Sequence, residues 1–305
     1  MTAVRVGIHA DEAMFVGPLE RRRALLGRAR RAGVDHVFVA DHVSFHTGFG
    51  MDGLVRAATI AAQEPELAVH IGVYLLALRH PVPVARQVAT LCESAPGRLV
   101  LGVGVGGEDR HEIEICGVDP KTRGRRTDES LAALRALLSG EPVSHSGEFF
   151  SFEKAWIRPA PDPPVPIVVG GRSGAALRRA GRLGDGWLGV WCSPRRFAEA
   201  RAEVEGHAAG RAVSWRHGLQ VWVGLGTERG AARERLSRTM EGFYQISFER
   251  FEKYCPYGGP EEVADFLAPY VAAGARDFNV MAVAASSEEA IDGVAEIRAR
   301  IGEGH

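Results

Sequence analysis

An aspartate and a histidine stand side by side at the end of a short apolar run. Residues 37–40 have the pattern of a strand buried on both faces, and Asp41-His42 follows them directly. Parallel α/β proteins place their chemistry at the carboxyl ends of strands, where a histidine titrates near neutrality or bonds a cofactor ring. Local sequence leaves one alternative open, a capping aspartate beside an exposed loop histidine.

Glycine-rich segments after two other apolar runs are candidate ligand sites. Gly170-Gly171-Arg172-Ser173 precedes a helical stretch, where free backbone amides and the helix dipole favour a phosphate, although Ser173 also suits an ordinary N-cap. Gly104 and Gly106 allow close backbone approach, but their spacing does not match a dinucleotide-binding fingerprint. A crowded strand that needs small side chains is the alternative for these two glycines.

Three arginines at 123, 125 and 126 begin a further helical stretch. Guanidinium groups bind phosphate well, so these residues could add charge-assisted bonds to an anionic ligand. A solvated helix face is the more common fate of such a cluster.

Eight short apolar runs alternate with amphipathic stretches along the chain, and this pattern predicts an α/β fold with a parallel sheet. The simplest architecture for that count is a (β/α)8 TIM barrel, with a doubly wound open sheet as runner-up. We expect one domain over residues 1–305, with insertions at about 106–164 and 241–259 after the fourth and seventh strands. The first insertion contains a predicted hairpin that turns near Ser146-Gly147. The predicted strands are 4–10, 36–41, 69–77, 98–105, 165–171, 186–190, 219–225 and 278–284.

Aromatic side chains near several strand ends predict a partly apolar pocket. Phe15 and Trp191 follow the first and sixth strands, and Phe243 and Tyr254 belong to the second insertion. Such a lining suits a flat conjugated ring and an apolar substrate. A satellite hydrophobic cluster on the rim, or a dimer contact, is the alternative.

Composition narrows the class of protein. The chain has 305 residues, a net charge of -1 and four scattered cysteines without metal-binding spacing. We therefore expect reduced thiols, a cytoplasmic location, no nucleic-acid or membrane partner, and no bound metal. A metal-dependent hydrolase built on His9, Asp11, Asp41 and His42 is a weaker alternative, because the other strand ends offer few ligands.

Several motifs in fixed order resemble the bacterial luciferase-like flavin oxidoreductases, especially the branch that uses the deazaflavin coenzyme F420. The resemblance covers almost the whole chain. Its segments are Ala-Gly-Val-Asp at 32–35, Ala-Asp-His-Val at 40–43, Gly-Val at 72–73, Leu-Ala-Leu-Arg-His-Pro at 76–81, Gly-Arg-Leu-Val-Leu-Gly at 97–102, Arg-Gly-Arg-Arg-Thr-Asp-Glu at 123–129, Pro-Ile-Val-Val-Gly-Gly-Arg-Ser at 166–173 and Asp-Gly-Trp at 185–187.

The resemblance implies a barrel, a bound deazaflavin and site residues at matching positions. It places Asp41 and His42 near the reactive ring and implies a non-proline cis peptide at Gly72-Val73 under that ring. It places Gly170, Gly171 and Ser173 near the phosphate tail, and we expect Arg172, Gly104 and Gly106 to bind the cofactor as well. Glu108 lies near an acid found in some members, offset in register, and replaces the Trp-Asn of many flavin enzymes together with Gly107.

The expected function is hydride transfer between coenzyme F420 and an unidentified apolar organic substrate. His42 would orient the ring or donate a proton, with Asp41 fixing its tautomer or bonding the ring. An FMN-dependent monooxygenase on the same scaffold is the first alternative, and a non-catalytic binding protein is another. Family members are often dimers, so the resemblance also implies a possible homodimer.

Overall fold

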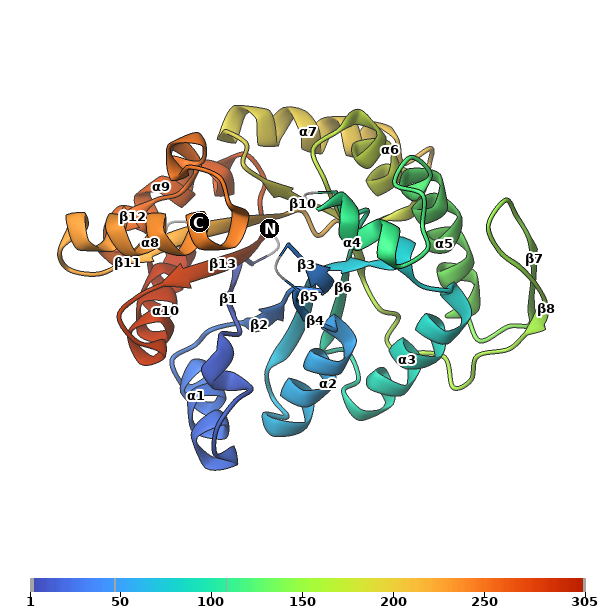
Figure 1. Cartoon of the computed structure of the whole chain (residues 1–305), viewed down its shortest axis with the longest axis horizontal. Coiled ribbons are helices and arrows are strands. Elements are labelled where there is room, and N and C mark those ends of the chain that lie inside the picture. Colours follow the sequence, from blue (N-terminus) through green and yellow to red (C-terminus); the bar gives the residue numbers. More distant parts are fainter. Residues whose placement is uncertain (1–2, 47, 108, 304–305) are drawn as a thin grey trace. The chain divides into compact units, whose positions relative to one another are not determined.

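Eight parallel strands form a closed (β/α)8 barrel, as the sequence predicts, in a computed structural model that describes residues 3–46, 48–107 and 109–303 (Figure 1). Each barrel strand pairs with the next one along the chain, and β1 closes the ring by pairing with β13. A short strand, β12 (Tyr257–Gly258), adds to β11. The barrel strands are β1 (Arg5–His9), β2 (His36–Val39), β5 (Ala68–Leu75), β6 (Leu99–Gly104), β9 (Ile167–Gly170), β10 (Gly186–Val190), β11 (Gly218–Leu225) and β13 (Asp277–Val283).

Helices fill the connections between these strands. None of the described helices combines the length and the apolar character that a membrane crossing requires. The α-helices are α1 (Leu19–Arg31), α2 (Gly53–Gln63), α3 (Pro81–Ser94), α4 (Arg110–Ile115), α5 (Arg123–Leu137), α6 (Gly174–Leu183), α7 (Pro194–Gly206), α8 (Arg229–Tyr244), α9 (Pro260–Ala272) and α10 (Ser287–Glu303). The 3-10 turns are η1 (Glu12–Met14), η2 (Leu76–Leu78), η3 (Phe248–Arg250) and η4 (Glu252–Tyr254).

The chain divides into two compact units, and each is described by itself. The first unit contains residues 1–38, 188–203 and 216–305, and the second contains residues 39–187 and 204–215. The boundaries run through β2 and β10. Residues 41–187, which include most of the predicted site, therefore belong to the second unit.

Burial explains why the barrel strands are recognisable in the sequence. Every residue of β2, β6 and β9 is buried, so these strands carry apolar or glycine runs instead of alternating patterns, apart from His36 at the start of β2. Helix α2 forms one of the amphipathic stretches between the apolar runs, and it begins where the Asp52 side chain accepts a hydrogen bond from the Val55 amide at 3.0 Å.

The first insertion contains the predicted hairpin, formed by β7 (Val143–Ser146) and β8 (Ser151–Ala155) (Figure 1). Glu129 of α5 holds its turn, because its carboxylate accepts hydrogen bonds from the amides of Phe149 at 3.0 Å and Phe150 at 2.9 Å. The sequence did not predict a second, smaller hairpin directly after β2, formed by β3 (His42–Phe45) and β4 (Phe49–Met51).

A bulge in β5 brings the Val73 side chain against the backbone of two glycines, Gly104 and Gly170. The register between β5 and β6 jumps from Ile71–Leu101 to Tyr74–Val103, and the peptide bond between Gly72 and Val73 is cis, as the resemblance implies. A Cβ atom at Gly104 would lie 2.4 Å from a Val73 methyl group, and one at Gly170 would lie 3.0 Å from the other. These glycines therefore serve packing, which confirms for Gly104 the alternative of a crowded strand.

Replacement of Gly104 by alanine should destabilise the protein by about 1–3 kcal/mol, because a β-branched valine cannot swing its methyl groups away. Urea unfolding followed by circular dichroism would measure the loss. Gly230→Ala is the matched control, since a Cβ there meets nothing within 4 Å. Equal stability of the Gly104→Ala variant and the wild type would contradict this packing argument.

A buried histidine makes stability depend on pH. His217 precedes β11 and is 3% exposed, and burial, with help from the charge of Arg201, lowers its pKa to about 4. The unfolded chain therefore binds more protons than the folded chain between about pH 6.5 and pH 4. Stability should fall by up to roughly 3 kcal/mol through that window as the pH is lowered.

The measurement is urea unfolding at several pH values for the wild type and for His217→Gln, which should show a flatter profile below pH 6.5. The same replacement at the exposed His111 serves as control. Parallel profiles for the wild type and His217→Gln would contradict the assignment.

Candidate functional site

Asp41 is a buried carboxylate that accepts four hydrogen bonds in the second unit. It lies just beyond β2, is 2% exposed, and accepts hydrogen bonds from the amides of Gly53 at 2.9 Å and Leu75 at 2.8 Å. Arg79 adds a bidentate pair at 2.7 and 2.9 Å and stacks on the Tyr74 ring at 4.2 Å. Burial raises the pKa of Asp41, while Arg79 and the two amides oppose that rise. Asp41 therefore ties β2, α2 and β5 together, and its contact with a cofactor stays a prediction.

His42 is bonded to a carboxylate that the sequence analysis missed. Its Nδ1 atom lies 3.1 Å from Glu112 Oε2 and 3.3 Å from Oε1. The expectation that Asp41 fixes the tautomer of His42 is therefore wrong, because Glu112 occupies that position. The side chain of His42 is 16% exposed and that of Glu112 is 2% exposed.

Glu112 also holds the backbone next to His42. Its Oε1 atom accepts hydrogen bonds from the amides of Val43 at 2.7 Å and Ser44 at 3.1 Å. Burial by itself would raise the pKa of Glu112, but the bonds from His42 and the two amides outweigh it and lower the pKa. A buried, ionised carboxylate thus faces the histidine.

A second carboxylate anchors the same hairpin. Asp109 accepts a hydrogen bond from the amide of His46 at 2.7 Å and caps α4 through the amide of His111 at 2.9 Å. Asp109 and Glu112 together fasten the β3–β4 hairpin to α4. The sequence does hold a signal for this helix, because an aspartate followed three residues later by a glutamate resembles a capping box.

The predicted phosphate segment lies at the beginning of α6. Ser173 is the N-cap, and its hydroxyl accepts a hydrogen bond from the Ala176 amide at 3.2 Å. Gly171 has φ +122°, a value that suits glycine, and its carbonyl accepts a hydrogen bond from the Trp187 indole at 2.7 Å. Arg172 is exposed. The cap reading is confirmed, and the phosphate role stays a prediction.

The three arginines of α5 are all bonded to protein groups. Arg126 donates to the Ala77 carbonyl at 2.8 Å, and Arg125 pairs with Glu148 at 2.9 Å on the surface. Arg123 donates to the Pro120 carbonyl. Their contribution to an anion site stays a prediction, and so does the role of Gly106, which has φ +69°. Glu108 lies outside the described residues.

The predicted aromatic residues belong to the first unit. The Trp191 ring lies 4.7 Å from Phe251 and 5.3 Å from Tyr244, and Phe15 is half-buried after η1. Phe243 packs on a hydrophobic cluster of Trp222, Leu236, Met240, Phe248 and Cys255. The second insertion thus builds a hydrophobic cluster, which was the alternative to a substrate pocket.

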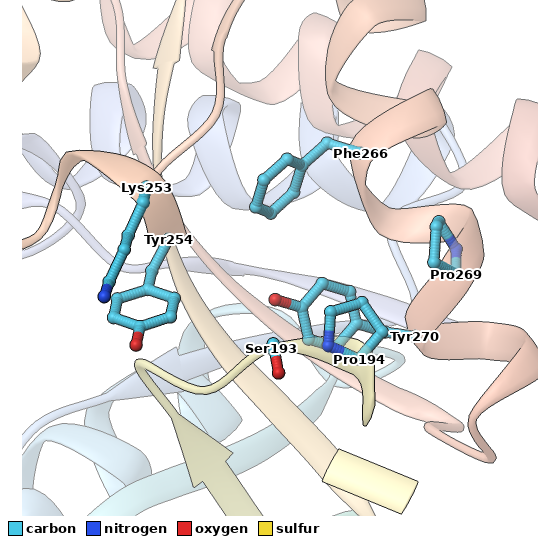
Figure 2. Close-up of a pocket in the computed structure, with 7 residues that line it drawn as sticks. All are labelled: Ser193, Pro194, Lys253, Tyr254, Phe266, Pro269 and Tyr270. Atoms are coloured by element: carbon cyan, nitrogen blue, oxygen red, sulfur yellow. The ribbon is translucent and has the colours of Figure 1, made fainter. Parts of the chain in front are cut away.

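Tyr254 lines a pocket of about 510 Å³ in this unit. Figure 2 shows Lys253 and Tyr254 on one side and three residues of α9, Phe266, Pro269 and Tyr270, on the other. Tyr270 donates from its hydroxyl to the Cys192 carbonyl at 2.6 Å. The assignment of Phe15, Trp191, Phe243 and Tyr254 to a substrate pocket stays a prediction.

Known proteins resemble the chain in sequence and in fold. An F420-dependent glucose-6-phosphate dehydrogenase of Nakamurella multipartita is 34% identical over 191 residues, which is 61% of this chain and 56% of the relative. One of Beutenbergia cavernae is 39% identical over 166 residues, or 52% of this chain and 49% of the relative. The match therefore spans about half the length of these curated relatives.

A solved F420-dependent secondary alcohol dehydrogenase, in complex with an F420-acetone adduct, superimposes with a TM-score of 0.85 at 22% identity. The superposition covers 98% of this chain and 99% of the other, and it shows that the fold is shared. The family model of the luciferase-like monooxygenases matches residues 1–253 of the 305. The chain therefore belongs to the luciferase-like monooxygenase family.

Proposed function

We propose that the protein is an oxidoreductase that transfers a hydride between coenzyme F420 and an organic substrate. The observation that carries the proposal is the pairing of His42 with the buried carboxylate of Glu112 just beyond β2. Such a pair can move a proton while a hydride moves. The relatives named for F420-dependent dehydrogenation of a sugar phosphate support the choice of cofactor.

The residues of the second unit fit a flat ring with an anionic tail. The bulge at Gly72 and Val73 interrupts the β5–β6 ladder, so its backbone is available to a ring, and contact of Gly104 and Gly170 with the cofactor beside their packing on Val73 is part of the proposal. Gly171, Arg172 and Ser173 stand before the positive end of the α6 dipole, which suits a phosphate. Bound deazaflavin supplies the carbon that accepts or donates the hydride.

Within this proposal His42 takes the proton from a substrate hydroxyl or returns it, and Asp41 keeps the site in place through Arg79. A further role of Gly106 along the cofactor and of Glu108 in proton transfer is part of the proposal. An apolar substrate is part of the proposal, and its support is Tyr254 of the second insertion, which lines a pocket in the first unit. A cytoplasmic location and a homodimer complete the proposal.

Two alternatives differ in cofactor. The family includes monooxygenases by name, so FMN is the competing cofactor for the same site. A metal-dependent hydrolase is less favoured, because the carboxylates of both Asp11 and Asp41 accept hydrogen bonds from protein groups.

Titration of the purified protein with coenzyme F420 and with FMN, side by side, tests the cofactor. We expect a dissociation constant in the micromolar range or below for F420 and binding at least about 10-fold weaker for FMN, a difference of roughly 1.4 kcal/mol. His42→Ala should keep F420 binding within about 10-fold and reduce hydride transfer on the order of 100-fold or more, because general acid–base catalysis contributes that much. Tighter binding of FMN, or binding of neither cofactor, would contradict the proposal.

A charge placed at the beginning of α6 tests the phosphate site. Ala175 is exposed in the first turn, so Ala175→Asp should repel an anionic tail and weaken F420 binding about 10-fold or more, although a carboxylate there favours the helix itself. Ala175→Asn has nearly the same shape without the charge and is the control. Calorimetric titration would measure both, and equal affinity in the two variants would place the tail elsewhere.

A further inference from the structure

We propose that the pocket lined by Tyr254 binds a small aromatic carboxylate, whose ring lies between the aromatic side chains and whose charge faces Lys253. The pocket belongs to the first unit, and no sequence motif assigns it a ligand. The inference goes beyond the proposed function and does not depend on its cofactor, because every residue that carries it belongs to this one unit.

The size and the walls of the pocket suit a flat molecule of one or two fused rings. Its volume is about 510 Å³, within the range of about 300–1,000 Å³ that small-molecule sites occupy. Tyr254 of η4 stands on one side, and Phe266 and Tyr270 of α9 stand on the other (Figure 2). Aromatic side chains bind a flat ring by offset stacking or edge contact, in addition to burying its surface.

The wall formed by α9 is fixed by contacts within the protein. Phe266 and Tyr270 are four residues apart, so they share one face of the helix, and their ring centroids lie 5.9 Å apart. Tyr270 is 2% exposed and donates its hydroxyl to the Cys192 carbonyl at 2.6 Å. Its ring also meets that of Phe197 edge-on, with 6.2 Å between the centroids. A wall that is already ordered lowers the entropic cost of binding.

Lys253 carries the only charge among the described residues that line the pocket. In the part of the chain that the structure describes, its ammonium group has no carboxylate partner, and Nζ lies 4.9 Å from the centroid of the Tyr254 ring. The neighbouring Glu252 is already paired, because its two oxygens accept hydrogen bonds from Arg233 at 2.6 and 2.9 Å. The pocket therefore favours an anion over a neutral or a cationic molecule.

The polar groups of the pocket match a carboxylate better than a phosphate. The Tyr254 hydroxyl makes no hydrogen bond to another described residue, and the Ser193 hydroxyl accepts one from the Arg196 amide at 3.3 Å, so both can still donate. One ammonium group and two neutral donors balance a single negative charge. A phosphate dianion is commonly held by the forked donors of arginine, and no arginine is among the described residues that line the pocket.

Titration with 2-naphthoate in the absence of any coenzyme tests the site. We expect saturable binding with a dissociation constant below about 1 mM, and binding of the uncharged 2-naphthamide about 3- to 5-fold weaker, as an exposed ion pair provides. Heteronuclear NMR of ¹⁵N-labelled protein measures both affinities. No binding of the acid below about 1 mM, equal affinity for the acid and the amide, or tighter binding of 2-naphthyl phosphate than of the acid would overturn the proposal.

Replacement of Lys253 by methionine tests the source of the charge preference. Lys253→Met keeps an unbranched side chain and removes the ammonium group, so the acid should lose its advantage of about 3- to 5-fold over the amide. Lys121→Met is the matched control, because Lys121 is an exposed lysine of the second unit, and it should bind both probes as the wild type does. An unchanged preference for the acid in Lys253→Met would contradict the assignment of the charge to Lys253.

Phe266→Leu tests the aromatic wall. Leucine keeps the pocket apolar but removes the ring, so both probes should bind at least about 3-fold more weakly. Phe152→Leu in the β7–β8 hairpin is the control and should leave both affinities unchanged. Circular dichroism and urea unfolding check that each variant is folded. Equal affinities in Phe266→Leu and the wild type would show that the probes bind elsewhere, and none of these titrations bears on coenzyme F420.

Discussion

The buried ion pair between Asp41 and Arg79 is the interaction on which the candidate site depends. The carboxylate also takes the amides at the beginning of α2 and at the end of β5, so three elements meet at one side chain. Removal of one partner from such a pair leaves an uncompensated buried charge, at a cost of about 3–5 kcal/mol. The position of the next residue, His42, follows from this anchor because the chain leaves β2 through Asp41.

The β3–β4 hairpin, which follows Asp41, is also held by carboxylates. A histidine directly after a strand would be mobile on an open loop, but here the chain folds back into a hairpin whose amides bond to Asp109 and Glu112 of the α4 segment. The acceptors are carboxylates, and hydrogen bonds to charged acceptors are stronger than hydrogen bonds between neutral groups. The histidine therefore has a defined orientation before any ligand arrives, which is the form of preorganisation that general acid–base chemistry needs.

Close packing of the Val73 side chain against glycine backbone is the third feature of the candidate site in the second unit. Val73 protrudes from the β5 bulge into space that exists because Gly104 and Gly170 lack side chains. A glycine-rich strand thus has a structural reason that is independent of any nucleotide. Several aromatic residues of the first unit pack in a hydrophobic cluster around Trp222 and Met240. Tyr254 lines a pocket in the same unit.

Much of the fold was predictable from the chain because most residues of the barrel strands are buried. Short, largely apolar runs mark these strands, and turn chemistry marks the hairpin at Ser146-Gly147. The sequence also pointed to Asp41 and His42 as neighbours at a strand end, and to Ser173 as a helix cap. Each of these predictions depends on residues that lie close together in the chain, so the amino-acid sequence alone reveals the pattern.

The partner of His42 was decided only by the tertiary structure. Glu112 lies 70 residues away along the chain, and nothing in its local sequence says which side chain its carboxylate will face. The same holds for Arg79 and Asp41, which are 38 residues apart, and for the use of Gly104 by Val73. Sequence periodicity fixes which face of an element is buried, whereas the pairing of charges across a barrel depends on strand register and on how loops fold back, and these are properties of the assembled chain.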